Sequence, residues 1–84
     1  QGPGMNYQQR LASALVALGE DDLPGALAGL GDALAEAERI DPEGPRVAEV
    51  CGYLARVQQQ AGDAAAARAT QARVDAIWAR FPEL

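Results

Sequence analysis

The sequence predicts an all-α fold of four helices, arranged as two stacked antiparallel hairpins. Alanine and leucine dominate the composition and enter helices at little cost, whereas the β-branched and aromatic residues that strands prefer are few. Apolar residues recur at three- and four-residue spacing in four successive segments, which is the spacing of one helix face. The second pair of segments repeats the pattern of the first, as expected for a helical hairpin that occurs twice.

The ends of the chain set the expected limits of the domain. Residues Gln1–Gly4 resemble the remnant of a cleaved expression tag, so we expect the native chain to begin at Met5. Residues 5–84 have the length of one domain. We expect the first hairpin at about residues 6–40 and the second at about residues 46–81.

The first hairpin has clear start and stop signals. We expect its first helix from about Asn6 to Leu18, ended by Gly19. The second helix follows Asp22, whose carboxylate can accept hydrogen bonds from the first turn, and runs to about Ile40. Glycines at positions 25 and 29 lie one turn apart in this helix. Either a neighbouring helix approaches closely there, or the segment is loosely packed.

The second hairpin begins after a proline-rich turn. The segment Asp41–Pro45 holds two prolines around a glycine and predicts a firm turn. A third helix is expected from about Arg46 to Ala61, and a fourth, capped by Asp63, to about Arg80. Across both hairpins, the residues expected to be largely buried are Leu11, Leu15, Leu27, Leu30, Leu34, Leu54, Val57, Val74 and Ile77.

The two hairpins correspond residue by residue around their turns. Leu54-Ala55 and Gly62 follow Leu11-Ala12 and Gly19 by 43 residues. Past the turn, Asp63 and Ala67 follow Asp22 and Ala26 by 41 residues. A repeat of this length indicates a solenoid of helical hairpins.

These positions resemble those of the tetratricopeptide repeat family. Leu54-Ala55 stands in the place of the family's Leu-Gly pair, Gly62-Asp63 matches its turn, and Ala67 matches its small residue in the second helix. The long link 40–46 resembles the kinesin-light-chain variety of the repeat. The resemblance covers nearly the whole native chain, although Gln8 and Cys51 stand where the family has tryptophan. It implies a fragment of a right-handed α-solenoid.

The resemblance also implies a function and a binding surface. Proteins of this family bind other proteins through the first helix of each hairpin. On this alignment the groove-facing residues are Asn6, Gln9, Ser13 and Val16 in the first hairpin and Glu49, Gly52, Arg56 and Gln59 in the second. We therefore expect a protein or peptide partner.

The composition argues against several other functions. The chain has no histidine and one cysteine, so His-based triads and zinc sites are not expected, and neither catalysis nor a cofactor is predicted. A net charge of −5 without a basic patch disfavours nucleic acid. Because the sequence has neither a membrane-spanning run nor a signal peptide, we expect a cytoplasmic protein.

Three residues of the second hairpin leave alternatives open. Cys51, at helical spacing from apolar neighbours, is either a small buried hydrophobe or a reactive thiol. Trp78 and Phe81 are expected to point inward as core or cap, with an exposed anchor for a partner as the alternative.

Self-assembly is the second functional class. The last helix carries more apolar bulk than one alanine-rich neighbour is expected to cover, so we expect a homo-oligomer. Residues 1–45 carry a net charge of −6 and residues 46–84 a net charge of +1, so the acidic hairpin could lie against Arg68, Arg73 and Arg80 of another copy. A two-fold dimer and a head-to-tail stack both fit. The candidate interface residues are Val74, Ile77, Trp78 and Phe81.

Overall fold

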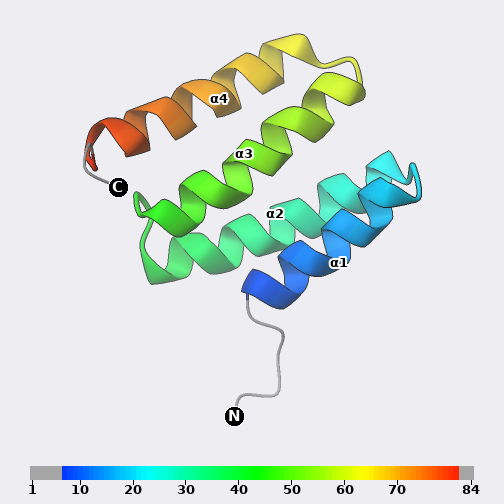
Figure 1. Cartoon of the computed structure of the whole chain (residues 1–84), viewed down its shortest axis with the longest axis horizontal. Helices are drawn as coiled ribbons and strands as arrows, with labels where there is room; N and C mark the ends of the chain where they lie inside the picture. The colour runs from blue at the N-terminus through cyan, green and yellow to red at the C-terminus, as the bar shows by residue number, and fades with distance from the viewer. Residues whose placement is uncertain (1–6, 82–84) are drawn as a thin grey trace.

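The computed structural model describes residues 7–81, which form four α-helices that follow one another in a single row (Figure 1). Helix α1 spans Tyr7–Gly19, α2 Leu23–Ile40, α3 Pro45–Gln60 and α4 Ala64–Ala79. Extensive contacts join α1 to α2, α2 to α3, and α3 to α4. Within residues 7–81 there is no strand, and the predicted pair of stacked hairpins is confirmed. The expectations for Gln1–Gly4 and Asn6 lie outside the described residues.

The helix boundaries follow from the capping residues. The carboxylate of Asp22 accepts a hydrogen bond from the Gly25 backbone N–H at 3.0 Å, and that of Asp63 accepts one from Ala66 at 3.1 Å. Both predicted N-caps are therefore confirmed. Pro45 occupies the first turn of α3, where its missing N–H leaves no bond unmade.

The two hairpin turns use different residues for the left-handed backbone position. Gly62 has a φ of +87°, which glycine adopts without steric cost. In the first turn Gly19 is the last helical residue, and the left-handed position falls on Asp21, with a φ of 60°. Aspartate tolerates this conformation better than most residues, so an insertion of two residues relative to the second turn is accommodated.

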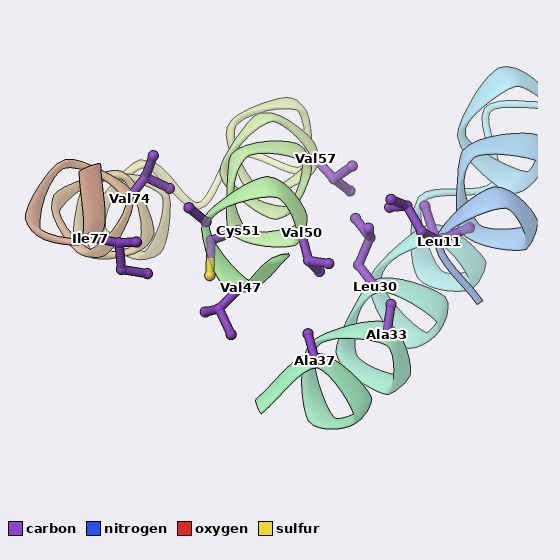
Figure 2. Close-up of a cluster of buried hydrophobic side chains, with 13 residues drawn as sticks. Leu11, Leu30, Ala33, Ala37, Val47, Val50, Cys51, Val57, Val74 and Ile77 are labelled. Atoms are coloured by element: carbon purple, nitrogen blue, oxygen red, sulfur yellow. The ribbon is translucent and has the colours of Figure 1, made fainter. Parts of the chain in front are cut away.

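The core lies along the middle of the row. Figure 2 shows Val50 and Val57 on the side of α3 that faces Leu30 of α2, and Cys51 on the side that faces α4. Alanines line much of the α2 surface that packs on its neighbours. The fully or nearly fully buried residues include Leu11, Ala14, Ala26, Leu30, Ala33, Ala37, Val47, Val50, Cys51, Val57, Val74 and Ile77.

Four of the nine predicted core residues are only half-buried. They pack against the core from its edges, because small alanines occupy the centre of the helix contacts and bring the backbones close together. The predicted burial is confirmed for the other five. The half-buried residues are Leu15, Leu27, Leu34 and Leu54.

Two glycines of α2 have different roles. A Cβ atom on Gly29 would lie 2.8 Å from the Cβ of Ala14 and 3.1 Å from its Cα, so α1 and α2 approach closely there. A Cβ on Gly25 would instead meet the capping carboxylate of Asp22. Close helix packing is therefore confirmed at Gly29 and wrong at Gly25.

Ion pairs connect the last helix to the middle of the chain. Arg73 Nη2 donates hydrogen bonds to Glu38 Oε2 at 2.6 Å and to the Pro42 carbonyl at 3.3 Å. Arg80 pairs with Glu43. These contacts join α4 to the end of α2 and to the link that follows it, across the seam between the hairpins.

None of the helices within residues 7–81 has the length and hydrophobicity that would let it cross a bilayer.

Candidate protein-binding surface

An open groove with a volume of about 740 Å³ runs between α3 and α4. Both helices contribute polar and apolar side chains to its walls. From α3 these include Glu49, Gly52, Tyr53, Arg56 and Gln59, and from α4 they include Ala67, Arg68, Gln71, Val74 and Trp78.

The groove contains every second-hairpin residue that the sequence assigned to the binding surface. Glu49, Gly52, Arg56 and Gln59 lie at three- and four-residue spacing, so they share one face of α3. Their place in a groove follows from the helix period and from the way α4 lies beside α3.

The first-hairpin candidates do not share this groove. Gln9, Ser13 and Val16 are exposed on α1, and none of them lines it. Tyr7 links α1 to the groove, since its hydroxyl donates a hydrogen bond to Glu49 Oε1 at 3.3 Å. The structure thus places the two predicted groups on different parts of the surface.

Trp78 lies at the junction of two hollows. It lines the α3–α4 groove and also a neighbouring hollow of about 550 Å³ formed with Tyr7, Pro45, Arg46 and Glu49. Its exposure is 39%. The expectation that Trp78 points inward is therefore wrong, because Ile77, one residue earlier and about 100° around the helix, occupies the inward position.

The other candidate interface residues are less available. Val74 and Ile77 are 8% and 4% exposed, and both belong to the core of the second hairpin. Phe81 is half-buried against that core. Of the four residues, Trp78 offers the most accessible apolar surface.

The charges of the groove divide between its ends. Arg56 lies over the ring of Tyr53, with its guanidinium carbon 6.0 Å from the ring centroid. Neither Arg56 nor Arg68 forms an ion pair with any residue in the described range 7–81. Glu49, which bonds Tyr7, is the groove's acidic residue.

Two of the three arginines expected to attract another copy already have partners within the chain, since Arg73 pairs with Glu38 and Arg80, just after α4, pairs with Glu43. These two arginines, which were expected to attract the acidic hairpin of another copy, thus pair with carboxylates of their own chain. Arg68 is the α4 arginine that remains for an outside carboxylate.

Cys51 is enclosed between α3 and α4 and is 1% exposed (Figure 2). Burial raises the pKa of the thiol above its ordinary value of 9.0, the nearby Arg73 charge lowers it, and Glu38 raises it. The interpretation as a small buried hydrophobe is supported over that of a reactive thiol, which needs access and a lowered pKa.

Residues 7–81 contain no group of three or more side chains suited to hold a metal ion.

The α4 wall of the groove was not predicted from the sequence. The binding face was assigned to the first helix of each hairpin, so Arg68, Gln71 and Trp78 were not included in it. One signal could have found Arg68: Arg56 and Arg68 each lie six residues from Gly62, which places them opposite each other in an antiparallel hairpin.

Comparison of the chain with protein-family models, with curated proteins and with solved structures gave no match.

Proposed function

We propose that this chain is a non-catalytic protein-binding module and that the α3–α4 groove is its binding surface. The observation that carries the proposal is the composition of the groove, in which arginine and aromatic side chains lie beside small residues. Tyrosine, tryptophan and arginine are the residues most enriched where proteins bind one another. Tyr53, Arg56 and Trp78 supply all three types in this groove.

The shape of the groove favours a helical or extended peptide over a small molecule. It follows two antiparallel helices of 16 residues each, so it is long and open along one side. An amphipathic helix can lie in such a channel and place successive side chains against both walls. The tetratricopeptide resemblance, which stays a prediction from the residues, points to the same class of partner.

The groove contains neither histidine nor cysteine. The chain has no histidine, and its one cysteine is enclosed between α3 and α4. This supports a role in binding rather than in catalysis.

Site-specific photocrosslinking tests the proposal in cells that express the native chain. A photoreactive amino acid at Gln59, in the groove, is expected to capture a discrete partner protein. The same amino acid at Ala35, on the exposed side of α2, serves as the control. Trp78→Ala should reduce the crosslink at Gln59. The proposal would be contradicted if the same proteins were crosslinked at Gln59 and at Ala35. It would also be contradicted if Trp78→Ala left the yield of the Gln59 crosslink unchanged.

Self-assembly is the second candidate function, and exposed apolar residues at both ends of the row favour it. Val16 on α1 is 62% exposed and Trp78 on α4 is 39% exposed, and these helices lie at opposite ends of the molecule (Figure 1). A head-to-tail contact would join the two ends, whereas a two-fold dimer would join two Trp78 faces. Sedimentation over a concentration series separates these states, and a strict monomer at high concentration would exclude both.

A further inference from the structure

The two ends of the α3–α4 groove differ in charge. Arg56 and Arg68 lie opposite each other near the Gly62 turn, and both are exposed. Glu49 precedes Arg56 by seven residues, or about 10 Å along α3, and Trp78 follows Arg68 by ten residues, or about 15 Å along α4. The groove therefore has a basic end and, two to three turns away, an end with Glu49 and an exposed indole.

The pairing of residues across the hairpin is supported by the neighbouring hollow. Arg46 and Trp78 each lie 16 residues from Gly62, and both line the hollow beside the groove. Arg46 and Trp78, at equal distance from the turn, thus lie close to each other across the hairpin. The same relation places Arg56 and Arg68 on the two walls at one level.

The two arginines have the properties of a carboxylate site. A guanidinium offers several N–H donors in one plane and pairs well with a carboxylate. The ion pairs formed within residues 7–81 involve Arg39, Arg73 and Arg80, and neither Arg56 nor Arg68 takes part in them. The Tyr53 ring beneath Arg56 restrains its guanidinium at the groove.

We propose that the groove takes an amphipathic helix of a partner protein, with a carboxylate of that helix between Arg56 and Arg68 and an apolar side chain two to three turns away against Trp78. The inference rests on the proposed function, because it names the partner of the same groove. Both Glu49 and Arg46 lie near the apolar anchor, so the charge preference of the site comes from Arg56 and Arg68.

The described helices of this chain do not offer such a segment to a second copy. Val16 has its nearest carboxylates only about one turn away, at Glu20 and Asp21. Ile40, which is 55% exposed, has Glu36 one turn before it, and that carboxylate pairs with Arg39. Asp32 lies two turns before Ile40 but about 80° around the helix. Another protein is therefore the better occupant.

Stapled helical peptides with a fluorescent label test the inference on the full chain. One peptide carries a glutamate and, two to three turns later, a leucine followed by a lysine. A second replaces the glutamate by glutamine, and a third replaces it by lysine. Fluorescence anisotropy measures the affinity of each peptide, and Trp78 emission gives an independent report on the apolar end.

The acidic peptide should bind the native chain most tightly. The double variant R56Q/R68Q should weaken it by about tenfold or more, as expected for loss of charged hydrogen bonds. The same variant should leave the glutamine peptide nearly unchanged. Arg39→Gln removes one exposed positive charge outside the groove and should change the affinity by less than about twofold. Circular dichroism confirms that each variant is folded.

The remaining outcomes separate the two proposals. If the three peptides bind equally, or if R56Q/R68Q leaves the acidic peptide unaffected, the carboxylate assignment is wrong while the groove remains a binding surface. If no peptide binds at millimolar concentration, both proposals are overturned. Sedimentation that shows dimers which dissociate on R56Q/R68Q substitution would identify a second copy as the occupant and overturn the inference.

Discussion

The Nη2 atom of Arg73 lies 2.6 Å from Oε2 of Glu38, across the seam between the two hairpins. The two side chains are 39% and 38% exposed, so water and salt screen the pair in part. It nevertheless joins α4 to α2, which have no extensive packing contact of their own.

We expect a double-mutant cycle of R73Q and E38Q to give a coupling free energy of no more than about 1 kcal/mol, which decreases as salt is added. Thermal unfolding at low and high ionic strength measures it. Arg39 and Glu36, an ion pair within α2, provide the matched control that does not cross the seam. A coupling that is unaffected by salt would contradict a screened ion pair.

Gly29→Ala and Gly31→Ala should have opposite effects on stability. A Cβ atom added at Gly31 would have no neighbour within 4 Å, so alanine there should stabilise the helix by roughly 0.5–1 kcal/mol. At Gly29 the new methyl group would meet Ala14 at 2.8 Å, and overpacking should cost about 1–3 kcal/mol. Urea unfolding of both variants measures the difference, and equal effects would show that α1 and α2 do not pack closely at Gly29.

Leu30→Ala should be the most damaging of the leucine substitutions, because Leu30 is fully buried between α1 and α3. We expect a loss of about 2–5 kcal/mol in the free energy of unfolding. Leu54→Ala, at a half-buried site, should cost less than Leu30→Ala. Denaturant midpoints compare the two variants. A greater loss for Leu54→Ala would show that Leu54 is the more deeply buried of the two leucines.

The stability of the chain should fall above pH 9.0 in a way that depends on Cys51. Burial raises the pKa of the folded thiol above the ordinary value of 9.0. Below pH 9.0 the thiol is protonated in both states and has no effect. Between 9.0 and the folded pKa the unfolded chain loses its proton first, so the free energy of unfolding falls as the pH rises.

The control for this pH dependence is Cys51→Ala, which removes the titrating group and leaves every other one in place. Denaturation curves at several alkaline pH values should show a shallower decline for the variant than for the native chain. Parallel declines would show that the pKa of Cys51 is the same in the folded and unfolded states.

Much of the fold could be predicted because its signals are local. Asp22 and Asp63 cap helices through bonds to residues three positions later, and the 41–45 turn follows from its own prolines and glycine. These signals set the helix boundaries to within about two residues. The residues of the α3 wall were expected from the resemblance to the tetratricopeptide repeat family, and helical spacing places Glu49 and Arg56 on one face.

The remaining features depend on how the helices lie against one another. Whether Trp78 or Ile77 points inward depends on the rotation of α4 about its axis, which alanine-rich helices leave weakly specified in sequence. The contact between Tyr7 and Glu49 joins residues 42 positions apart and has no local signature. For the same reason the leucines at the core edges could not be distinguished from Leu30 at its centre.

The row of helices in Figure 1 also implies an order of local opening. Helices α2 and α3 each pack on two neighbours, whereas α1 and α4 each have extensive contacts with one. The outer helices can therefore detach while the inner pair stays folded. Amide hydrogens in the middle of α2 and α3 should exchange with solvent most slowly, and those of α1 and α4 should exchange faster. A partner that fills the α3–α4 groove would slow amide exchange in α4 first. Binding would therefore stabilise α4, which forms one wall of the groove, against local opening.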